Sequence, residues 1–291
     1  MRPLPGILTI IPPPRQWEPA RVDRKAFEIA TLTRAIGIDT VSIPEVIEEK
    51  SRGERTIPYR LKVDNAYFGR LLRKHNPQLT IILNKVVPVM KKDEFERWLQ
   101  EHSPEYQHLV LVGGESSRIQ YPGYSPTEAA PIAARYVKHL YGITIFHRRN
   151  EAARLLKKTK AGIGAFFSQI IFDLCHVRET LDEYYYLARK EGIKPARIYI
   201  SIAPISRERD LDFIKWLGVM IPYELEKRFR ENPDRMEGLS LEVIRNLVEE
   251  ISKWEYDLGI NMEHVMLNNL HLAGYALHRI NGILRGRGKG K

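Results

Sequence analysis

The stretch Gly162-Ile163-Gly164-Ala165-Phe166-Phe167-Ser168-Gln169-Ile170-Ile171-Phe172-Asp173 holds a long apolar run. Such a run is typical of a strand that is covered on both faces, as in a parallel sheet. A serine and a glutamine interrupt the run near its end. Because a buried amide without hydrogen-bond partners costs about 1–3 kcal/mol, we expect Gln169 either to find a partner in the core or to contact a ligand.

Other short apolar runs, each bounded by turn residues, alternate with amphipathic segments along the chain. Together with the run at 165–172, they lie at residues 7–11, 40–43, 79–83, 109–112, 143–146, 198–202 and 265–270. This alternation predicts parallel strands joined by crossover helices. Eight such units in 291 residues predict an α/β fold, a closed (β/α)8 TIM barrel.

The main alternative is an open, doubly wound sheet, which would need a glycine-rich first turn to hold a dinucleotide. The first strand ends instead in Pro12-Pro13-Pro14-Arg15, where no backbone amide is free before Arg15. Helical stripes follow Ser206 and Ser240, and the long excursion between Gly218 and His264 predicts one or two extra helices before the last strand. We therefore expect one barrel domain over residues 1–284 and a basic flexible tail over 285–291.

The composition favours a soluble, cytoplasmic protein. Hydrophobic residues make up 43% and charged residues 28% of the chain, and Cys175 is the only cysteine. No apolar run reaches the roughly 18–20 residues of a membrane span, and the first residues, Met1-Arg2-Pro3-Leu4-Pro5, lack the apolar region expected of a signal peptide. The net charge of +10 calls for an acidic partner. Because the cations are dispersed along the sequence, a small anionic molecule is favoured over nucleic acid as the partner. The sequence leaves open whether the protein forms a homo-oligomer.

In a barrel, binding and catalytic groups gather at the carboxyl ends of the strands. The polar residues expected there are rich in cations and amides, which favours a polyanionic cofactor and a planar, hydrogen-bonding substrate. No pair shows metal-ligand spacing such as H-E-x-x-H, so we expect no metal site. The candidates include Asn84 after the third strand, Glu115 after the fourth, His147 after the fifth, Gln169 in the sixth and Asn268 in the eighth.

Four motifs, in order along the chain, resemble the methylenetetrahydrofolate reductase family of flavin-dependent barrels. They are Pro13-Pro14-Arg15, Ala161-Gly162-Ile163-Gly164-Ala165-Phe166-Phe167-Ser168-Gln169, Ile202-Ala203-Pro204-Ile205-Ser206 and Leu217-Gly218-Val219-Met220-Ile221-Pro222. The resemblance implies a one-carbon enzyme that binds a folate or modified pterin and receives hydride from FAD or NAD(P)H.

The resemblance also implies roles for single residues. Gln169, Glu115 and Asn268 would hold the pterin, with Glu115 as the catalytic carboxylate. His147, Glu151, Lys157, Lys158 and Asn84 would serve the cofactor. Glu115 can equally be a loop carboxylate, and the two lysines a solvated helix face.

The family places its general acid, a glutamate, on the first strand, where this chain has Thr9 or Ile10. A threonine cannot supply the proton that opens the ring of a methylene-pterin. The missing acid motivates an alternative: a divergent pterin-binding or methyl-transfer barrel without reductase activity.

Overall fold

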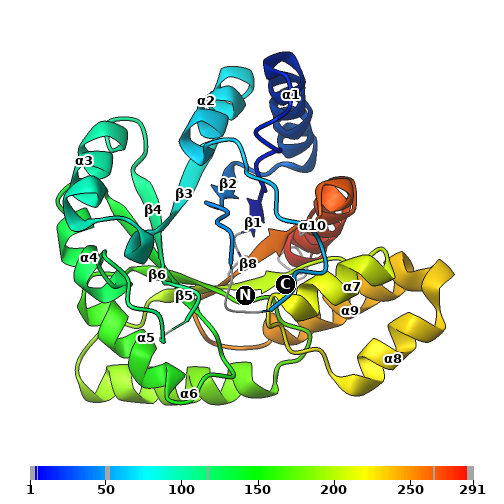
Figure 1. The fold of residues 1–291 in the computed structure, drawn as a ribbon. Helices are drawn as coiled ribbons and strands as arrows, with labels where there is room; N and C mark the ends of the chain where they lie inside the picture. Colours follow the sequence, from blue (N-terminus) through cyan, green and yellow to red (C-terminus); the bar gives the residue numbers. More distant parts are fainter. Residues whose placement is uncertain (1–3, 5, 50–52, 117, 265, 287–291) are drawn as a thin grey trace.

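The eight strands of the chain close into a barrel in sequential order (Figure 1), as the alternation of apolar runs predicts. A computed structural model describes residues 4, 6–49, 53–116, 118–264 and 266–286. All eight pairings are parallel, from β1 with β2 round to β8 with β1. The strands are β1 (Gly6–Thr9), β2 (Thr40–Ile43), β3 (Thr80–Val86), β4 (His108–Val112), β5 (His139–Thr144), β6 (Ala165–Ser168), β7 (Arg197–Ile202) and β8 (Leu258–Glu263).

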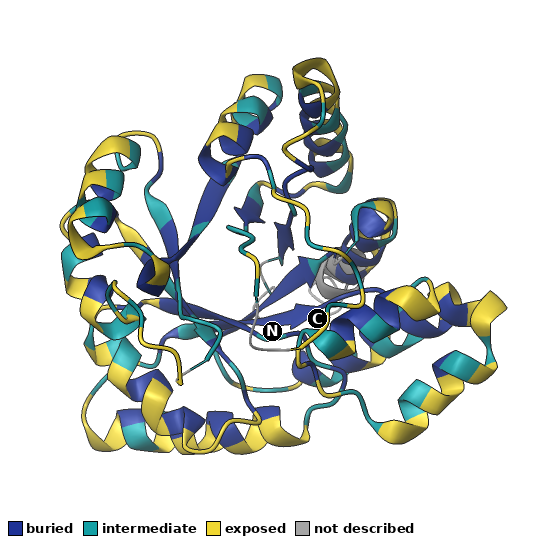
Figure 2. Cartoon of the chain, viewed as in Figure 1, coloured by how far each residue is buried: buried dark blue, intermediate teal, exposed yellow. Residues whose placement is uncertain are grey.

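The helices lie around the outside of this barrel and turn their apolar stripes towards it (Figure 2), which leaves yellow, exposed faces outside. Local signals set several of their ends. Asp64 caps α2 through the amide of Tyr67, and Ser125 forms a capping box with Glu128 at α4. The helices are α1 (Pro19–Ile36), α2 (Asn65–His75), α3 (Lys92–His102), α4 (Pro126–Ala133), α5 (Glu151–Lys160), α6 (Cys175–Lys190), α7 (Glu208–Trp216), α8 (Tyr223–Glu231), α9 (Met236–Ile251) and α10 (Leu270–Gly286), with short 3-10 turns η1 (Val87–Val89), η2 (Pro233–Arg235) and η3 (Leu267–Asn269).

Side chains alternate between the two faces of each strand, so each strand serves two cores. Leu8, Val41 and Ile81 belong to the large cluster between strands and helices. Ile7, Ile82 and other apolar residues form a second, smaller cluster. Since neighbours along a strand point to opposite sides, this smaller cluster fills the barrel interior.

The last strand lies earlier in the chain than the sequence predicts. The structure places β8 at Leu258–Glu263, whereas residues 267–269 of the predicted run 265–270 form η3 and Leu270 begins α10. Residue 265 lies outside the described residues. The prediction was wrong because Val265, Met266 and Leu267 are three consecutive apolar residues, whereas the apolar residues of the true strand alternate with Gly259, Asn261 and Glu263. Ser240 was also misjudged: it is buried inside α9, where its hydroxyl accepts a hydrogen bond from the amide of Ile205.

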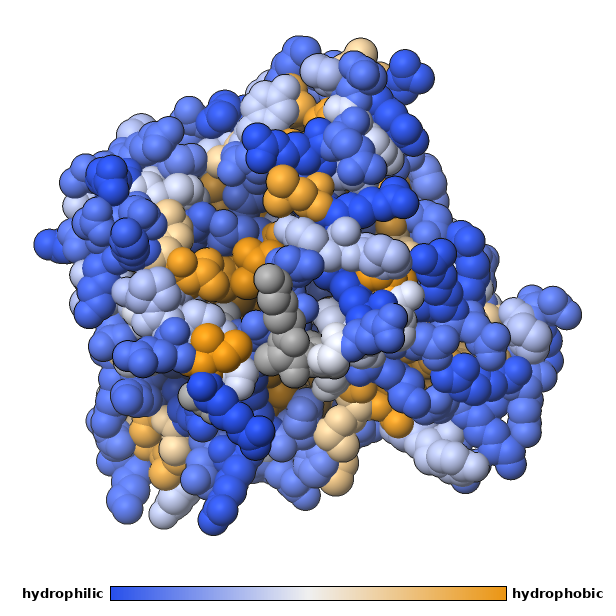
Figure 3. Space-filling view, in the orientation of Figure 1, coloured by the Kyte–Doolittle hydropathy of each residue, from blue (hydrophilic) through white to orange (hydrophobic). Residues whose placement is uncertain are grey.

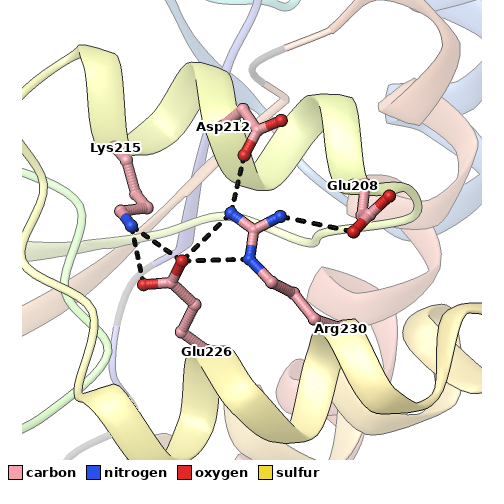
Figure 4. Close-up of polar contacts among 5 residues, drawn as sticks. All are labelled: Glu208, Asp212, Lys215, Glu226 and Arg230. Carbon is pink, nitrogen blue, oxygen red and sulfur yellow. Dashed lines mark hydrogen bonds and ion pairs between the residues drawn. The ribbon is translucent and has the colours of Figure 1, made fainter.

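The one or two extra helices predicted between Gly218 and His264 are present as α8 and α9, and the stripe after Ser206 forms α7. An ion-pair network joins α7 to α8 (Figure 4). Arg230 on α8 reaches Asp212 at 2.7 Å and Glu208 at 3.3 Å on α7, and Lys215 on α7 reaches Glu226 at 2.7 Å. Their apolar sides pack on the segments that follow β6 and β7, so this pair of helices forms a wall beside the carboxyl end of the barrel.

Two remaining predictions concern the ends and the membrane. The predicted boundary at 284 falls inside α10, which continues to Gly286, and residues 287–291 of the predicted tail lie outside the described residues. Among the described residues, every helix is too short or too polar to cross a lipid bilayer.

Candidate functional site at the carboxyl end of the barrel

Three neighbouring strands place a connected set of polar side chains at the carboxyl end of the barrel. The hydroxyl of Thr9 on β1 donates to Asn261 Oδ1 on β8 at 2.7 Å. The amide nitrogen of Asn261 donates to Ser201 Oγ on β7 at 2.9 Å and to Glu263 Oε1 at 3.1 Å. Asn261 and Glu263 share a face of β8 because they are two residues apart. The four side chains therefore form one network inside the barrel.

Glu263 is the carboxylate of this network and the last residue of β8. Thr9 on β1 is its register partner across the sheet. Burial raises the pKa of the Glu263 carboxyl to about 7, although a hydrogen bond with Ser201 pulls it the other way. The residue keeps intermediate exposure, so it is deep but still accessible from the mouth. A carboxyl that titrates near neutral pH can both give and take a proton there.

A second polar pair lies on β2 and β3. Ser42 donates its hydroxyl proton to Asn84 Oδ1 at 2.9 Å. Asn65, at the start of α2, donates to the backbone carbonyls of Asn84 at 2.8 Å and of Ile43 at 3.2 Å. Asn84, predicted as a cofactor contact, thus lies on an inner strand face with its carbonyl already bonded, and no described residue accepts from its Nδ2.

The opposite side of the barrel end is apolar. Phe167 on β6 belongs to the inner cluster, and Val112 on β4 and Ile143 on β5 are partly buried and pack against it. Phe167 stacks on Tyr199 with ring centroids 5.3 Å apart. In the face drawn in Figure 3, apolar residues likewise gather towards the middle of a mainly hydrophilic surface. A mouth with one polar and one apolar side suits a flat heterocycle that hydrogen bonds along one edge.

Gln169 follows β6 and is held by the protein on both ends of its amide. Its Nε2 donates to the carbonyl of Leu217 at 3.2 Å, and its Oε1 accepts from the amide of Ile170 at 3.0 Å. Of the two expectations for Gln169, the structure therefore shows the first: its amide has hydrogen-bond partners within the protein. Contact with a pterin stays a prediction, and it would use the second amide proton or the second lone pair.

Glu115 lies in the loop that follows β4, close in sequence to the barrel end. The loop is folded against Tyr121, whose hydroxyl accepts a hydrogen bond from the backbone amide of Ser116 at 3.4 Å. A Cβ at Gly114 would come within 2.4 Å of the Tyr121 ring, so glycine is needed there for the ring to close over the backbone. Glu115 has intermediate exposure and its own partner. Its role as a ligand or acid stays a prediction.

The predicted cofactor residues around α5 separate into two kinds. Glu151 is buried, and its Oε1 accepts from the Thr144 hydroxyl at 2.9 Å and the Ile145 amide at 3.2 Å. Lys158 donates to the carbonyl of Ile143 at 2.6 Å, and burial lowers its pKa. These two side chains join the start and the end of α5 to β5.

His147 and Lys157 are exposed, by contrast. His147 lies in the turn after β5, where burial and the charge of Arg148 lower its pKa. Lys157 lies in the last turn of α5. The structure therefore leaves only these two of the four predicted residues accessible to a cofactor phosphate.

Asn268 does not lie on a strand, contrary to its predicted place. It is exposed in η3, where its amide nitrogen donates to Asn269 Oδ1 at 2.7 Å. Its neighbour Asn269 is buried and also donates to Asp210 at 2.9 Å. These bonds tie the segment after β8 to the start of α7, so binding by Asn268 is a prediction without support from its position.

Sequence reasoning missed Glu263, because the last strand was placed after it. A signal for the correct strand was present: Leu258, Ile260 and Met262 alternate with Gly259, Asn261 and Glu263. Strict alternation indicates a strand with two different faces. The inner face of that strand carries both an amide and a carboxylate at its carboxyl end.

Comparison with known proteins adds the fold but no family. No protein-family model matches the chain, and no curated protein matches its sequence. Among solved structures, an uncharacterized protein from Clostridium thermocellum that binds two copies of 5-methyl-5,6,7,8-tetrahydrofolic acid has a TM-score of 0.77 at 20% identity, covering 97% of this chain and 96% of that one.

Two monooxygenases are more distant. RslO1 from Streptomyces bottropensis has a TM-score of 0.61 at 14% identity, over 98% of this chain and 99% of its own. The oxygenating constituent of 3,6-diketocamphane monooxygenase from Pseudomonas putida, in complex with FMN, has a TM-score of 0.56 at 11% identity, over 96% and 97%. These likenesses show that the chain is a (β/α)8 barrel.

Proposed function

We propose that this chain binds a reduced pterin of the folate type at the carboxyl end of its barrel and exchanges a proton with it through Glu263. The observation that carries the proposal is the Glu263 carboxyl itself, with a pKa of about 7 beside the amide of Asn261. Across from it lie the apolar side chains of β4 to β6. The folate-binding barrel from Clostridium thermocellum, which matches nearly the whole chain, supports the choice of ligand.

The finer proposal is a reductase of the methylenetetrahydrofolate reductase type. In that reaction the bond between the methylene carbon and N10 breaks, N10 takes a proton, and a hydride adds to the methylene carbon to leave a methyl group on N5. The resemblance puts the acid near Thr9 on β1, and Glu263 is the register partner of Thr9 on the next strand. Glu263 would therefore deliver the proton from the neighbouring strand.

Bound FAD or NAD(P)H would supply the hydride in this reaction. The side chains that the resemblance assigns to a flavin fit it only in part, because Glu151 and Lys158 bond within the protein. Arg149 and Arg154 are exposed near His147 and Lys157 and could add positive charge for a phosphate. Binding of the ligand and proton transfer by Glu263 do not depend on which donor is used.

The same observation favours a second candidate function, a pterin-binding or methyl-transfer barrel without reductase activity. Such a protein would keep the polar network of β7, β8 and β1 but would need no flavin site. It would bind 5-methyltetrahydrofolate without reducing the methylene form.

The test compares wild type with Glu263→Gln, which keeps the size and one hydrogen bond but cannot donate the acid proton. We expect both proteins to bind 5-methyltetrahydrofolate with dissociation constants within a few-fold in calorimetry. Single-turnover reduction of 5,10-methylenetetrahydrofolate by reduced flavin or NAD(P)H should fall by about 10²–10⁴-fold in the variant, the usual contribution of a general acid.

A matched rescue sharpens the test. In the Glu263→Gln background, Thr9→Glu returns a carboxyl to the neighbouring strand and should recover part of the rate. Binding without turnover in the wild type would support the second candidate function. If wild type binds neither folate at millimolar concentration, the proposed ligand is wrong.

A further inference from the structure

A pocket of about 600 Å³ lies outside the strands, between the loop after β1 and the loop after β2. Its walls come from these two loops and from the first turns of α1 and α2. The loops are joined by backbone hydrogen bonds from Arg15 to the carbonyl of Leu61 at 2.8 Å and from Val63 to the carbonyl of Pro13 at 2.9 Å. The pocket volume lies in the range of small-molecule sites, and none of its lining residues belongs to a barrel strand.

Aromatic and aliphatic side chains supply much of the lining. Trp17, Tyr59 and Tyr67 bring rings to it. Leu61 is 51% exposed and Tyr67 is 41% exposed, so this apolar surface faces solvent in the protein alone. A ligand with a flat apolar body would bury both.

The acidic groups of the pocket are already engaged. Glu45 accepts from Lys85 Nζ at 2.5 Å and from the amide of Val86 at 2.7 Å. Asp64 accepts from the amide of Tyr67 at 2.8 Å as the cap of α2. Glu48 is exposed at the rim, within electrostatic reach of Arg55.

Two basic side chains of the pocket have no such partners. The structure shows no hydrogen bond or ion pair for the Lys62 ammonium or the Arg15 guanidinium with any described residue. Lys62 is half-buried; burial lowers its pKa, and the charges of Arg55 and Arg60 lower it further. The amino-terminal ends of α1 and α2 at the same pocket add positive potential. Lys62 is half-buried and Arg15 is exposed at the same pocket, so a bound anion can form charge-assisted hydrogen bonds with both.

We propose that this pocket binds a small aromatic carboxylate, with the carboxylate between Lys62 and Arg15 and the ring against Tyr59, Tyr67 and Leu61. The site is separate from the barrel mouth and does not rest on the folate proposal. Tyr59 is fixed for this role by its hydroxyl, which donates to the carbonyl of Val46 at 3.1 Å.

The test uses 2-naphthoate, its uncharged analogue 2-naphthamide, and inorganic phosphate as probes in calorimetry with the full chain. We expect naphthoate to bind at least 10-fold more tightly than naphthamide, and phosphate alone to bind more weakly than naphthoate. Lys62→Met should weaken naphthoate about 10-fold or more. Arg24→Gln, which removes one exposed positive charge from α1, should leave it unchanged.

A second variant checks the location. Val46→Trp should fill the pocket and abolish naphthoate binding while the thermal transition stays within a few degrees of wild type. Equal binding of naphthoate and naphthamide would overturn the proposal, as would equal effects of the Lys62 and Arg24 changes, or binding that survives Val46→Trp. Phosphate binding as tightly as naphthoate would replace the aromatic carboxylate with a plain anion.

Discussion

The barrel mouth and the loop pocket contain similar polar groups but arrange them in opposite ways. In the mouth, Thr9, Ser201, Asn261 and Glu263 bond to one another on strands whose register fixes their spacing. In the pocket, Glu45 and Asp64 bond to other groups, and no residue that the structure describes pairs with the cations Lys62 and Arg15. A fixed network holds a proton donor in one place, and this arrangement suits proton transfer to a bound substrate. Unpaired cations in loops suit the binding of an anion.

The largest effect expected from this contrast is on the pH dependence of stability. Burial raises the pKa of the Glu263 carboxyl to about 7 in the folded protein, from its ordinary value of 4.5. Between these values the folded state holds the proton more tightly, so the contribution of Glu263 to stability falls as pH rises from 4.5 to 7. Above pH 7 the ionised carboxylate costs at most about 3 kcal/mol. Glu263→Gln should therefore stabilise the protein at pH 8 and change little at pH 4.

Urea unfolding at several pH values measures this difference, with Glu255→Gln, an exposed carboxylate, as the matched control. In the Glu263→Gln variant, the contribution of the neighbouring residue His264 to the pH dependence of stability can be measured without that of Glu263. Burial lowers the pKa of His264 to about 4, and its Nε2 accepts from the amide of Ile11 at 3.2 Å. The stability supplied by neutral His264 is present above pH 6.5 and is lost as pH falls towards 4. If the Glu263→Gln protein is less stable than wild type at pH 8, burial at the barrel mouth does not destabilise the ionised Glu263 carboxylate.

The contrast also explains what the sequence could predict. Alternating apolar runs and helical stripes are local signals, and they predicted the closed barrel and the helices α7 to α9. The side-chain partners of the site are not local. Thr9 and Asn261 are 252 residues apart, and Gln169 and Leu217 are 48 apart. No periodicity shows that Glu151 turns inward to Thr144. The alternation over residues 258–263 does mark the last strand, and Glu263 was missed because that strand was placed seven residues too late.

The second prediction concerns the loop that forms one wall of the pocket. Its residue Arg55 lies over the rings of Trp216 at 4.9 Å and Phe213 at 5.2 Å on α7, and over Tyr59 at 5.5 Å. Figure 1 shows the segment passing from the β2 side towards α7. Arg55→Met keeps the apolar contact but removes the cation, so we expect a loss of about 1 kcal/mol. Naphthoate binding should weaken several-fold, because the loop is held less firmly.

Hydrogen exchange of the amides between residues 53 and 63 measures that loosening directly. Folate binding at the mouth should stay within two-fold of wild type, since the strand network does not use Arg55. Arg60→Gln, which removes an exposed cation from the same loop, is the control for the exchange measurement. Equal loss of affinity for both ligands in Arg55→Met would mean that the loop serves the barrel mouth and the pocket together, and that the two regions are not independent.

The smallest effect is expected at the ion pairs between α7 and α8 (Figure 4). Arg230 contacts Asp212, Glu226 and Glu208 there, and the two nearest acids raise its pKa. Because the Arg230 side chain is 35% exposed, Arg230→Gln should cost only about 0.5–1 kcal/mol, measured by urea unfolding at low salt. At about 1 M NaCl, where charges are screened within roughly 3 Å, most of this difference should vanish.

Lys227→Gln, at an exposed pair with Glu231 on α8, is the matched control and should change stability less. Both ligand affinities should stay unchanged in Arg230→Gln, because the network touches neither the mouth nor the pocket. A change in naphthoate affinity would instead mean that α8 positions α7, and through Arg55 the loop of the pocket.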